Sequence, residues 1–554
     1  MAEHDADVIV VGSGSMGSLA ALQIARAGRD VLILEAGPVV PDWKITENFR
    51  SSPRKGNLNA PFGDLPYAPN SWSPGYVDDD IDVAMIPGTL RIAGGTSRHW
   101  TGVAWRLLPE EMRMRSLFGV SRDWPLDYGA LEPWYTAAEY EVGVLGADET
   151  DYSGQERGLP YPPRSKPYPL PPEAKPYFLQ RFQMRTAERG YRLLHAPNVR
   201  LSRPYGGRPA CIGNNICNPN CPIGAKHSGL HDLQAAQDAG ARLVTGAVVD
   251  RLERGEGGRI AAVSYLDPEG ARTTLTAKAF VIAAHGFETP KLLLMNDLAN
   301  GSGMVGRNLM MHPTLTMGFF AGEDLWVGRG QYLHGANLQR RLQPDRGERS
   351  GGFYQFMNHN PALTLGASFF EDESGSGNYA EAGGDGDGGG RGGGRRRLIG
   401  PELDAELRRR AARYMSSQLL LEDLPEPENV VAVNPAHRTP LGQPGISIRY
   451  RLQDYCRDAL PRTLDDFANW VQAMDAVPHE RPGDTWSNQH HIMGTTIMGD
   501  DPADSVVDAD LRCHDHDNLF LVTTGVFPSS SCVNPTLTGM ALAMRAGAHI
   551  AGVI

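Results

Sequence analysis

The stretch Val8–Gly37, VIVVGSGSMGSLAALQIARAGRDVLILEAG, decides the fold of this chain. It opens with the short β-branched run Val8–Val11, which is typical of a buried parallel strand. Gly12, Gly14 and Gly17 follow with GxGxxG spacing. In this pattern the first glycine permits a tight turn and the second lets the backbone approach a pyrophosphate. The third lets helix and strand pack closely.

The residues after the glycines complete the unit. The apolar stretch Leu19–Ala25 continues as a helix, whose N-terminus can hold phosphate with its free N–H groups. Val31–Leu34 is a second apolar strand, and Glu35 at its end is placed to accept a hydrogen bond from a ribose hydroxyl. Strand, helix, strand and acidic residue therefore predict a dinucleotide-binding site, and an ordinary glycine-rich turn is the alternative.

The composition is that of a globular protein of 554 residues, with 41% hydrophobic and 21% charged residues. The formal net charge of −12 would repel a polyanion, so we expect no nucleic acid partner. No apolar run reaches the ~20 residues that a membrane-spanning helix needs. The first residues run straight into a strand, and we expect no export signal on this chain.

Three of the six cysteines cluster, and the other three are scattered. Cys211, Cys217 and Cys221 fall within eleven residues, and Pro222 completes the C-x3-C-P ending seen in bacterial iron–sulfur proteins. Three thiolates suit a [3Fe–4S] cluster. Zinc would want a fourth ligand, for which His227 is a candidate, and a disulfide plus a free thiol is the structural alternative.

Further motifs carry a family resemblance. They are GGTS at 94–97, HGFETPKLLL at 285–294, VGRNLMMHP at 305–313, HIMGTTIMG at 491–499 and CVNPTLT at 532–538. Together with GSGSMG and LEAG, they make the chain resemble the glucose–methanol–choline (GMC) family of flavin oxidoreductases over nearly its whole length. The segment RPACIGNNICNPNCPIGAKHSG at 208–229 makes it similar, more closely, to the large subunits of bacterial membrane-associated sugar and polyol dehydrogenases of the fructose, glucose and gluconate type.

The resemblance implies a mixed α/β fold with FAD rather than NAD as cofactor. A Rossmann-like FAD-binding domain is expected to be interleaved with a substrate domain built on an antiparallel sheet. We expect the FAD-binding domain to take residues 1–45, 84–110, 195–315 and 481–554, with the cysteines at 211–221. We expect the substrate domain to take 46–83, 111–194 and 316–480. Residues 371–397 are rich in glycine and aspartate, cannot bury apolar surface and are expected to form a disordered surface insertion.

The resemblance also implies a catalytic pair. Oxidation of an alcohol by flavin needs a base for the hydroxyl proton, and a neutral imidazole suits that task. In the family this base is a histidine in an HxxGT motif, which is His491 here. Its family partner, a histidine or asparagine about forty residues later, matches Asn534, which would hold the substrate oxygen. Taken alone, His491 would be read as a helix cap or a core residue.

Contacts with FAD are implied in the same way. Some relatives attach the flavin covalently to a histidine at the place of His99, and a ring packed against the flavin without a bond is the alternative. The other implied contacts are Gly12, Gly14, Ser15, Met16, Gly17, Glu35, Ala36, Gly94, Gly95, Thr96, Ser97, Trp100, Thr101, Val249, Ala284, Gly286, Gly525, Asn534, Pro535 and Thr536.

The sequence thus predicts an FAD-dependent dehydrogenase that oxidises a sugar, sugar acid or polyol hydroxyl by hydride transfer to flavin N5. Electrons would leave singly through the [3Fe–4S] cluster to a cytochrome c or quinone partner. In the relatives a small subunit carries the export signal and a multihaem cytochrome c anchors the complex to the membrane. A periplasmic location through such partners is expected, with a cytoplasmic enzyme as the alternative. The competing functions are an O₂-using GMC sugar or alcohol oxidase with structural cysteines, and a non-catalytic flavoprotein.

Overall fold

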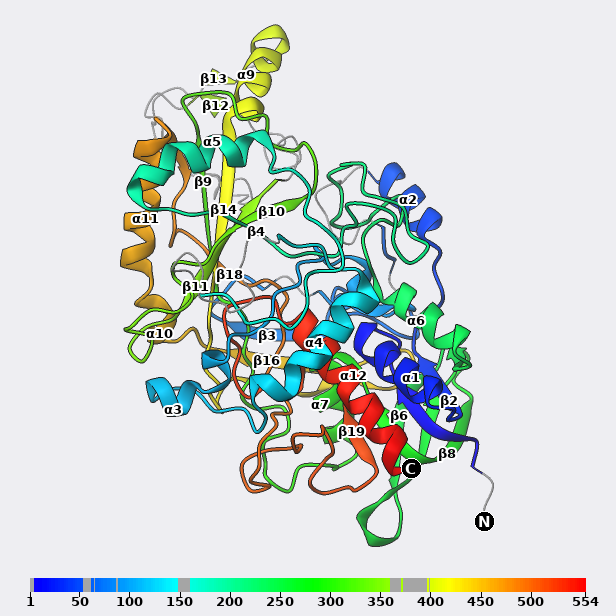
Figure 1. The fold of residues 1–554 in the computed structure, drawn as a ribbon. Helices are drawn as coiled ribbons and strands as arrows, with labels where there is room; N and C mark the ends of the chain where they lie inside the picture. The colour runs from blue at the N-terminus through cyan, green and yellow to red at the C-terminus, as the bar shows by residue number, and fades with distance from the viewer. Residues whose placement is uncertain are drawn as a thin grey trace.

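Two large sheets and the helices packed on them make up most of the fold in the computed structural model (Figure 1). The structure describes residues 4–52, 61–63, 65–85, 88–147, 160–358, 370–371, 396–397 and 399–554. The glycine-rich tract is described only at its ends, where β12 (Phe370–Glu371) pairs with β13 (Arg396–Arg397). Residues 372–395 lie outside the described residues, so the expected disordered insertion stays a prediction.

Strand β1 (Ala6–Val11) lies in the middle of the first sheet, as its β-branched run predicts. The other strands of this sheet are β2 (Val31–Glu35), β5 (Arg242–Thr245), β6 (Val248–Arg254), β7 (Ile260–Leu266), β8 (Arg272–Ile282) and β19 (Leu519–Leu521). Their order is β5–β2–β1–β8–β7–β6, and β19 also pairs with β8. The strands β5, β2, β1, β8 and β19 pair in parallel, whereas β6 and β7 are antiparallel.

Helices pack in a layer next to this sheet. They are α1 (Ser15–Arg26), α4 (Tyr128–Val142), α6 (Gly229–Asp238) and α12 (Thr536–Val553). Helix α1 contacts both α6 and α12, and α12 also contacts α4 (Figure 1). Met16 at the start of α1 lies directly against Gly539 of α12. This contact brings the C-terminal loop that precedes α12 next to the glycine turn after β1.

The second large sheet is antiparallel throughout. Its strands are β4 (Leu194–His195), β9 (Thr314–Phe320), β10 (Leu333–Asn337), β11 (Gly352–Met357), β14 (Tyr414–Leu421), β17 (Val477–Glu480) and β18 (Trp486–Ser487). Their order is β17–β9–β14–β11–β10–β4, with β18 paired to β9. One face packs on α5 (Tyr177–Thr186) and α11 (Leu460–Ala473), where the Trp470 ring lies 4.7–5.6 Å from the rings of Tyr354, Phe182 and Phe356.

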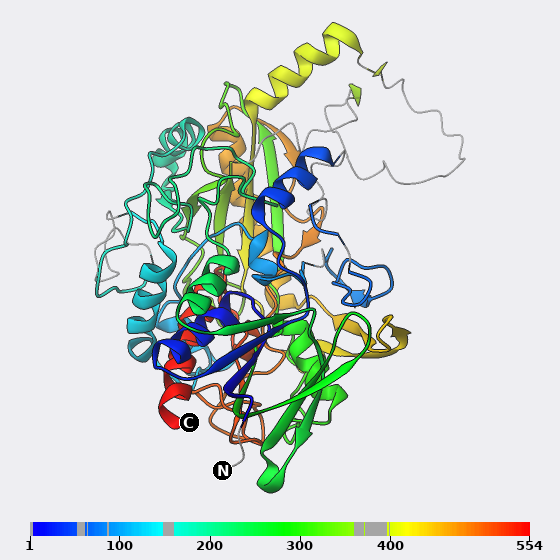
Figure 2. The same ribbon diagram turned by 90° about the vertical axis from the view of Figure 1, so that its right-hand side faces the viewer.

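The remaining elements surround these two sheets. They are α2 (Asp42–Ser51), β3 (Val77–Ile81), α3 (Met114–Phe118), α7 (His285–Met295), α9 (Gly400–Arg413), β15 (Val430–Arg438), β16 (Pro444–Tyr450) and α10 (Asp454–Arg457). The strands β15, β16 and β3 form a third, smaller sheet, and α9 projects from the body of the protein (Figure 2). None of the helices in the described part of the chain combines the length and the hydrophobicity that a membrane span requires.

The predicted mixed α/β fold is confirmed, with a Rossmann-like parallel unit in one sheet and an antiparallel second sheet. The parallel unit follows from local sequence, because a β-branched strand, a glycine turn and an apolar helix leave few other arrangements. The residue ranges expected for the two domains stay a prediction.

Candidate active site

A cavity of about 590 Å³ opens at the carboxyl ends of the parallel strands. Its wall includes Gly12 after β1, Glu35 at the end of β2, Ala284 after β8 and Thr523 after β19. Residues of β11 and β14 line the same cavity, so it lies between the two large sheets. Open α/β sheets bind their ligands at the carboxyl ends of the strands, which is where this cavity is found.

Most residues predicted to contact FAD line the cavity. They are Gly12, Gly14, Ser15, Met16, Glu35, Ala36, Gly95, Thr96, Ser97, His99, Trp100, Thr101, Val249, Ala284, Asn534, Pro535 and Thr536. Gly17, Gly94, Gly286 and Gly525 are not part of the wall. The carbonyl of Gly286, for example, accepts a hydrogen bond from Thr495 Oγ1 at 2.7 Å. Direct contact of these four glycines with FAD stays a prediction.

The three glycines of the turn differ in what surrounds them. Gly12 has a φ of +102°, and a Cβ there would lie 2.5 Å from the carbonyl oxygen of Ala283. A Cβ on Gly17 would overlap the carbonyl oxygen of Gly12, so the close packing of α1 on β1 requires glycine. A Cβ on Gly14 would meet no protein atom within 4 Å. Gly14 therefore faces open space in the cavity, where the pattern predicts the pyrophosphate.

Glu35 closes the turn as well as lining the cavity. Its Oε2 accepts from the N–H of Ser13 at 3.0 Å and from Ser13 Oγ at 2.5 Å, and its Oε1 accepts from the N–H of Gly37 at 2.8 Å. Burial raises the pKa of Glu35, and these three hydrogen bonds act in the opposite direction. The predicted ribose contact would come from a carboxylate that the chain already holds in place.

His99 is a buried residue of the cavity wall. Its ring lies edge-on to Phe62 at 5.8 Å, and its Nδ1 has no hydrogen-bond partner among the described residues. Burial lowers the pKa of His99 to about 3, so the ring is neutral at pH 7. Both alternatives for His99 need the ring in the cavity, and the covalent bond stays a prediction.

His312, His491 and Asn534 form a hydrogen-bonded row. His312 Nδ1 lies 2.8 Å from His491 Nδ1, and Asn534 Nδ2 lies 3.3 Å from His491 Nε2. His312 Nε2 lies 3.1 Å from the carbonyl oxygen of Ser531. His312 is fully buried, whereas His491 and Asn534 line the cavity. The structure brings the two predicted catalytic residues together and adds a third residue behind them.

These hydrogen bonds decide which ring nitrogens carry protons. A carbonyl only accepts, so His312 Nε2 donates to Ser531. Burial lowers the pKa of His312 to about 4, so this ring is neutral and its Nδ1 accepts. His491 Nδ1 is then the donor of the 2.8 Å bond, and its Nε2 keeps its lone pair. Burial also holds the pKa of His491 well below its usual value, so an unprotonated Nε2 faces the cavity.

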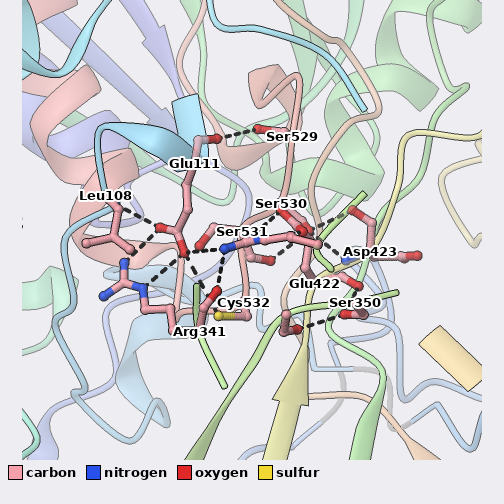
Figure 3. Close-up of polar contacts among 12 residues, drawn as sticks. Leu108, Glu111, Arg341, Ser350, Glu422, Asp423, Ser529, Ser530, Ser531 and Cys532 are labelled. Carbon is pink, nitrogen blue, oxygen red and sulfur yellow. Dashed lines mark hydrogen bonds and ion pairs between the residues drawn. The ribbon is translucent and has the colours of Figure 1, made fainter. Parts of the chain in front are cut away.

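Asp423 is hydrogen-bonded both to the segment that carries His312 and to the loop of Ser530. Its Oδ2 accepts from the N–H of Met311 at 3.0 Å and from the Tyr450 hydroxyl at 2.7 Å. Its own N–H donates to Ser530 Oγ at 2.8 Å, and Ser530 Oγ donates to the Asp423 carbonyl at 2.9 Å (Figure 3). Burial raises the pKa of Asp423 to about 7. One residue thus anchors both the segment that carries His312 and the loop that receives its hydrogen bond.

Four buried charges support the same loop (Figure 3). Arg341 makes hydrogen bonds of 3.0 and 2.8 Å to the Glu111 carboxylate, and Arg346 lies 2.9 Å from Glu422. Burial opposes ionisation of Glu111, but the two arginines lower its pKa to about 2. Ser529 Oγ donates to the Glu111 carbonyl at 3.2 Å. Loss of any one charge would leave its partner buried and unpaired, so this group resists rearrangement.

The three clustered cysteines lie on one loop beside the cavity. Cys217 is buried, Cys211 and Cys221 are half-buried, and all three are free thiols. The Sγ atoms of Cys211 and Cys221 each accept a backbone N–H at 3.4 Å. Asn218, within the same loop, lines the cavity. Over the described ranges, no three His, Cys, Asp or Glu side chains converge closely enough to hold a metal ion.

The buried ammonium of Lys226 joins this loop to the predicted flavin segment. Its Nζ donates to the carbonyls of Trp100 at 2.6 Å and of Cys217 at 2.7 Å. Trp100 Nε1 in turn donates to the carbonyl of His227 at 2.7 Å. Burial lowers the pKa of Lys226 to about 8, and nearby Cys217 and Cys221 act in the opposite direction. The buried ammonium thus holds the backbone of the cysteine loop against the predicted flavin segment.

Comparisons with known proteins agree with this geometry. Two family models described as GMC oxidoreductase match residues 200–314 and 425–543. The fructose dehydrogenase large subunit of Gluconobacter japonicus is 35% identical, over 98% of this chain and 97% of that protein. The 2-methyl-1,2-propanediol dehydrogenase of Mycolicibacterium austroafricanum is 27% identical, over 98% and 95%. A structure of Aspergillus oryzae formate oxidase shares the fold, with a TM-score of 0.64 and 14% identity over 99% of both chains.

Two residues of this site are missing from the sequence-based assignment. His312 is the second-last residue of the motif VGRNLMMHP, but its partner His491 lies 179 positions away, and no spacing rule links them. Lys226 follows the cysteines in the stretch PIGAKHSG, and lysine is a residue type that is rarely buried. In both cases the sequence showed the motif that contains the residue, but it did not show which residues it contacts in the fold.

The turn glycines give a first prediction. Gly17→Ala should lower the free energy of unfolding by about 1–3 kcal/mol with or without FAD, because the methyl group overlaps the Gly12 carbonyl. Gly14→Ala should leave flavin-free stability within about 0.5 kcal/mol and weaken FAD binding at least ~10-fold. Thermal unfolding and FAD titration measure the two effects. Equal FAD affinity in Gly14→Ala and the unchanged protein would contradict the placement of the cofactor.

The proton positions on His312 and His491 give a second prediction. His312→Phe removes the acceptor that holds His491 Nδ1–H, and should slow anaerobic flavin reduction by substrate about 10²-fold. His312→Asn can place an amide oxygen near the lost Nδ1 and should recover part of the rate. Stopped-flow absorbance of the flavin measures both. Equal rates in the two variants, with FAD retained, would show that the proton position on His491 does not depend on His312.

Proposed function

The chain belongs to the GMC oxidoreductase family, and on that premise we propose that it is an FAD-dependent dehydrogenase of a sugar, sugar acid or polyol. We propose also that its electrons leave singly through a [3Fe–4S] cluster to a cytochrome c or quinone. The row of His312, His491 and Asn534 is the main support for this proposal. It offers a base and a hydrogen-bond donor for the substrate oxygen beside the predicted flavin segment.

In the proposed reaction His491 Nε2 takes the proton of the substrate hydroxyl, since it holds a lone pair and faces the cavity. Asn534 Nδ2, which approaches the same nitrogen to 3.3 Å, donates to the substrate oxygen without titrating. FAD, when bound, supplies a hydride acceptor at N5. After it takes this proton, the His491 ring is a cation. His312 Nδ1 stabilises the charged ring by accepting a hydrogen bond from His491 Nδ1–H.

The cysteine loop supports the proposed exit of electrons. Cys211, Cys217 and Cys221 are the three residues that would hold the cluster, which takes electrons one at a time. Asn218 of this loop lines the cavity, and Lys226 links the loop to Trp100. A hydrogen-bonded connection therefore runs from Trp100 through Lys226 to the backbone of Cys217.

The proposed partners rest on a relative. The Gluconobacter protein is named as a large subunit, which supports assembly of this chain with further subunits. We propose a small export-type subunit and a multihaem cytochrome c, and through them a periplasmic, membrane-associated location. Copurification of a tagged chain with its neighbours from the native host tests this assembly.

The proposed base gives a third prediction. His491→Ala should lower the rate of flavin reduction by substrate ~10²- to 10⁴-fold while FAD remains bound, because the hydroxyl proton loses its acceptor. His549→Ala, which changes a histidine of α12 that is not part of the cavity wall, is the matched control. Near-normal reduction in His491→Ala would remove this residue from the role.

The cluster gives a fourth prediction. Anaerobically purified protein should contain about three irons per flavin, with acid-labile sulfide. Cys217→Ser should lose the iron and the reduction of a one-electron acceptor, yet keep flavin reduction by substrate. Cys513→Ala, which changes a buried cysteine outside the loop, should keep both. Iron-free protein that turns over with O₂ would instead identify an oxidase with structural cysteines.

A further inference from the structure

Three glutamine side chains form a hydrogen-bonded row on the cavity wall. Gln355 on β11 and Gln418 on β14 are direct cross-strand partners, and Gln355 Nε2 donates to Gln418 Oε1 at 2.9 Å. The same Nε2 lies 3.4 Å from Gln489 Oε1. Gln489 stands two residues before His491, and all four side chains line the cavity. Through Gln489, the row is therefore connected to the segment that carries the proposed base.

Gln355 is polar at a place where its neighbours are apolar. Phe353 and Met357, on the same face of β11, belong to the hydrophobic core, and Tyr354 and Phe356 on the opposite face pack on Trp470. Gln355 is only 3% exposed, so its amide must be hydrogen-bonded to offset the loss of water. Its nitrogen is satisfied, but its Oε1 has no partner among the described residues.

The row presents donors and acceptors side by side. Gln355 Oε1 is a buried acceptor without a partner among the described residues, on a side chain that lines the cavity. Gln418 and Gln489 use their oxygens to accept from Gln355, and in the described structure their Nε2 groups make no hydrogen bond. A hydroxyl group both donates and accepts, so neighbouring hydroxyls of one molecule match this surface. An ionised carboxylate only accepts, so it could satisfy the Nε2 groups of Gln418 and Gln489 but could donate to no acceptor of the row.

The cationic side chains of the described cavity wall are already paired. Arg91 lies 2.7 Å from Glu288, and Lys291 lies 3.3 Å from Glu288 and donates to the Tyr76 hydroxyl at 2.7 Å. These residues come from α7 and from the segment before Gly94, and not from the strands of the glutamine row. A carboxylate bound at the row would find no free cation among them.

Three of the four histidines of the described wall are neutral at pH 7, because they are buried. Burial lowers the pKa of His99 to about 3 and of His285 to about 4, and it holds the pKa of His491 well below its usual value. The fourth, His490, packs its ring against Gly88. His99, His285 and His491 thus add no cation to the described wall.

We infer that the substrate is an uncharged polyhydroxylated molecule, a neutral sugar or sugar alcohol rather than a sugar acid, and that Gln355, Gln418 and Gln489 hold its hydroxyl groups. This inference rests on the proposed function, because it takes the cavity beside His491 as the substrate site. It limits the proposed substrates to neutral sugars and sugar alcohols, and it uses only residues of the cavity wall and none of the cysteine loop.

Substrate class is tested by anaerobic reduction of the enzyme-bound flavin. Neutral hexoses, pentoses and hexitols, with fructose and glucitol among them, are compared with aldonates and uronates, with gluconate among them. The inference expects the best neutral compound to exceed every acid about 10²-fold in kcat/KM. An acid that equals or exceeds the neutral compounds would overturn this inference and leave the dehydrogenase standing. Reduction by no compound of either group would overturn both.

The roles of the glutamines are tested by substitution. Gln355→Met and Gln418→Met should each raise KM for the best neutral substrate about 3- to 10-fold, with a smaller change in kcat. Gln453→Met, at an amide that donates to the Leu424 carbonyl and is not part of the wall, is the control. Gln418 is half-buried, so its variant carries the test even where Gln355→Met fails to fold. Unchanged KM and Kd in Gln418→Met, with flavin content retained, would overturn the assignment.

A gain of function completes the test. Gln418→Arg adds a cation to the wall and should raise the kcat/KM ratio of aldonate to neutral substrate at least ~10-fold. An unchanged ratio in folded, flavin-loaded enzyme would show that the row does not face the substrate, and would overturn the inference.

Discussion

The hydrogen bond from His312 Nε2 to the carbonyl of Ser531 is the constraint on which the proposed catalytic geometry depends. Because a carbonyl cannot donate, this bond decides the proton positions on two rings and leaves His491 Nε2 unprotonated. Ser531 has a φ of +54°, a conformation that is unfavourable for serine. The hydrogen bonds of Ser530 with Asp423 and of Ser529 with Glu111 hold the loop in that conformation.

The two large sheets contribute different kinds of wall to one cavity. The parallel sheet offers strand ends, glycines and a helix N-terminus, so its recognition of a dinucleotide depends mainly on the backbone. The antiparallel sheet offers alternate side chains of β11 and β14, among them Gln355 and Gln418. Side chains on such a wall can change without altering the fold, which lets one family act on different alcohols.

The cysteine loop and the segment after Gly95 are joined by side chains that are buried or nearly so. Lys226 bonds to carbonyls on both sides, and Trp100 bonds back to the loop. This arrangement places the proposed cluster ligands next to the proposed flavin site, and it makes the position of each sensitive to the other.

Local sequence determined the β1–α1–β2 unit, the glycine turn and the spacing of Cys211, Cys217 and Cys221, because each depends on backbone preferences and periodicity over a few residues. His491 and Asn534 could be named from motifs, and the structure places both on the cavity wall. The bond from His491 to His312 and the glutamine row were decided only by tertiary structure. Gln355 and Gln418 stand 63 positions apart and meet through strand register. The two histidines stand 179 apart and meet because β9 pairs with β18 and Met310 forms a bridge with Met493. No local preference reaches across such separations, so these contacts exist only once the whole chain has folded.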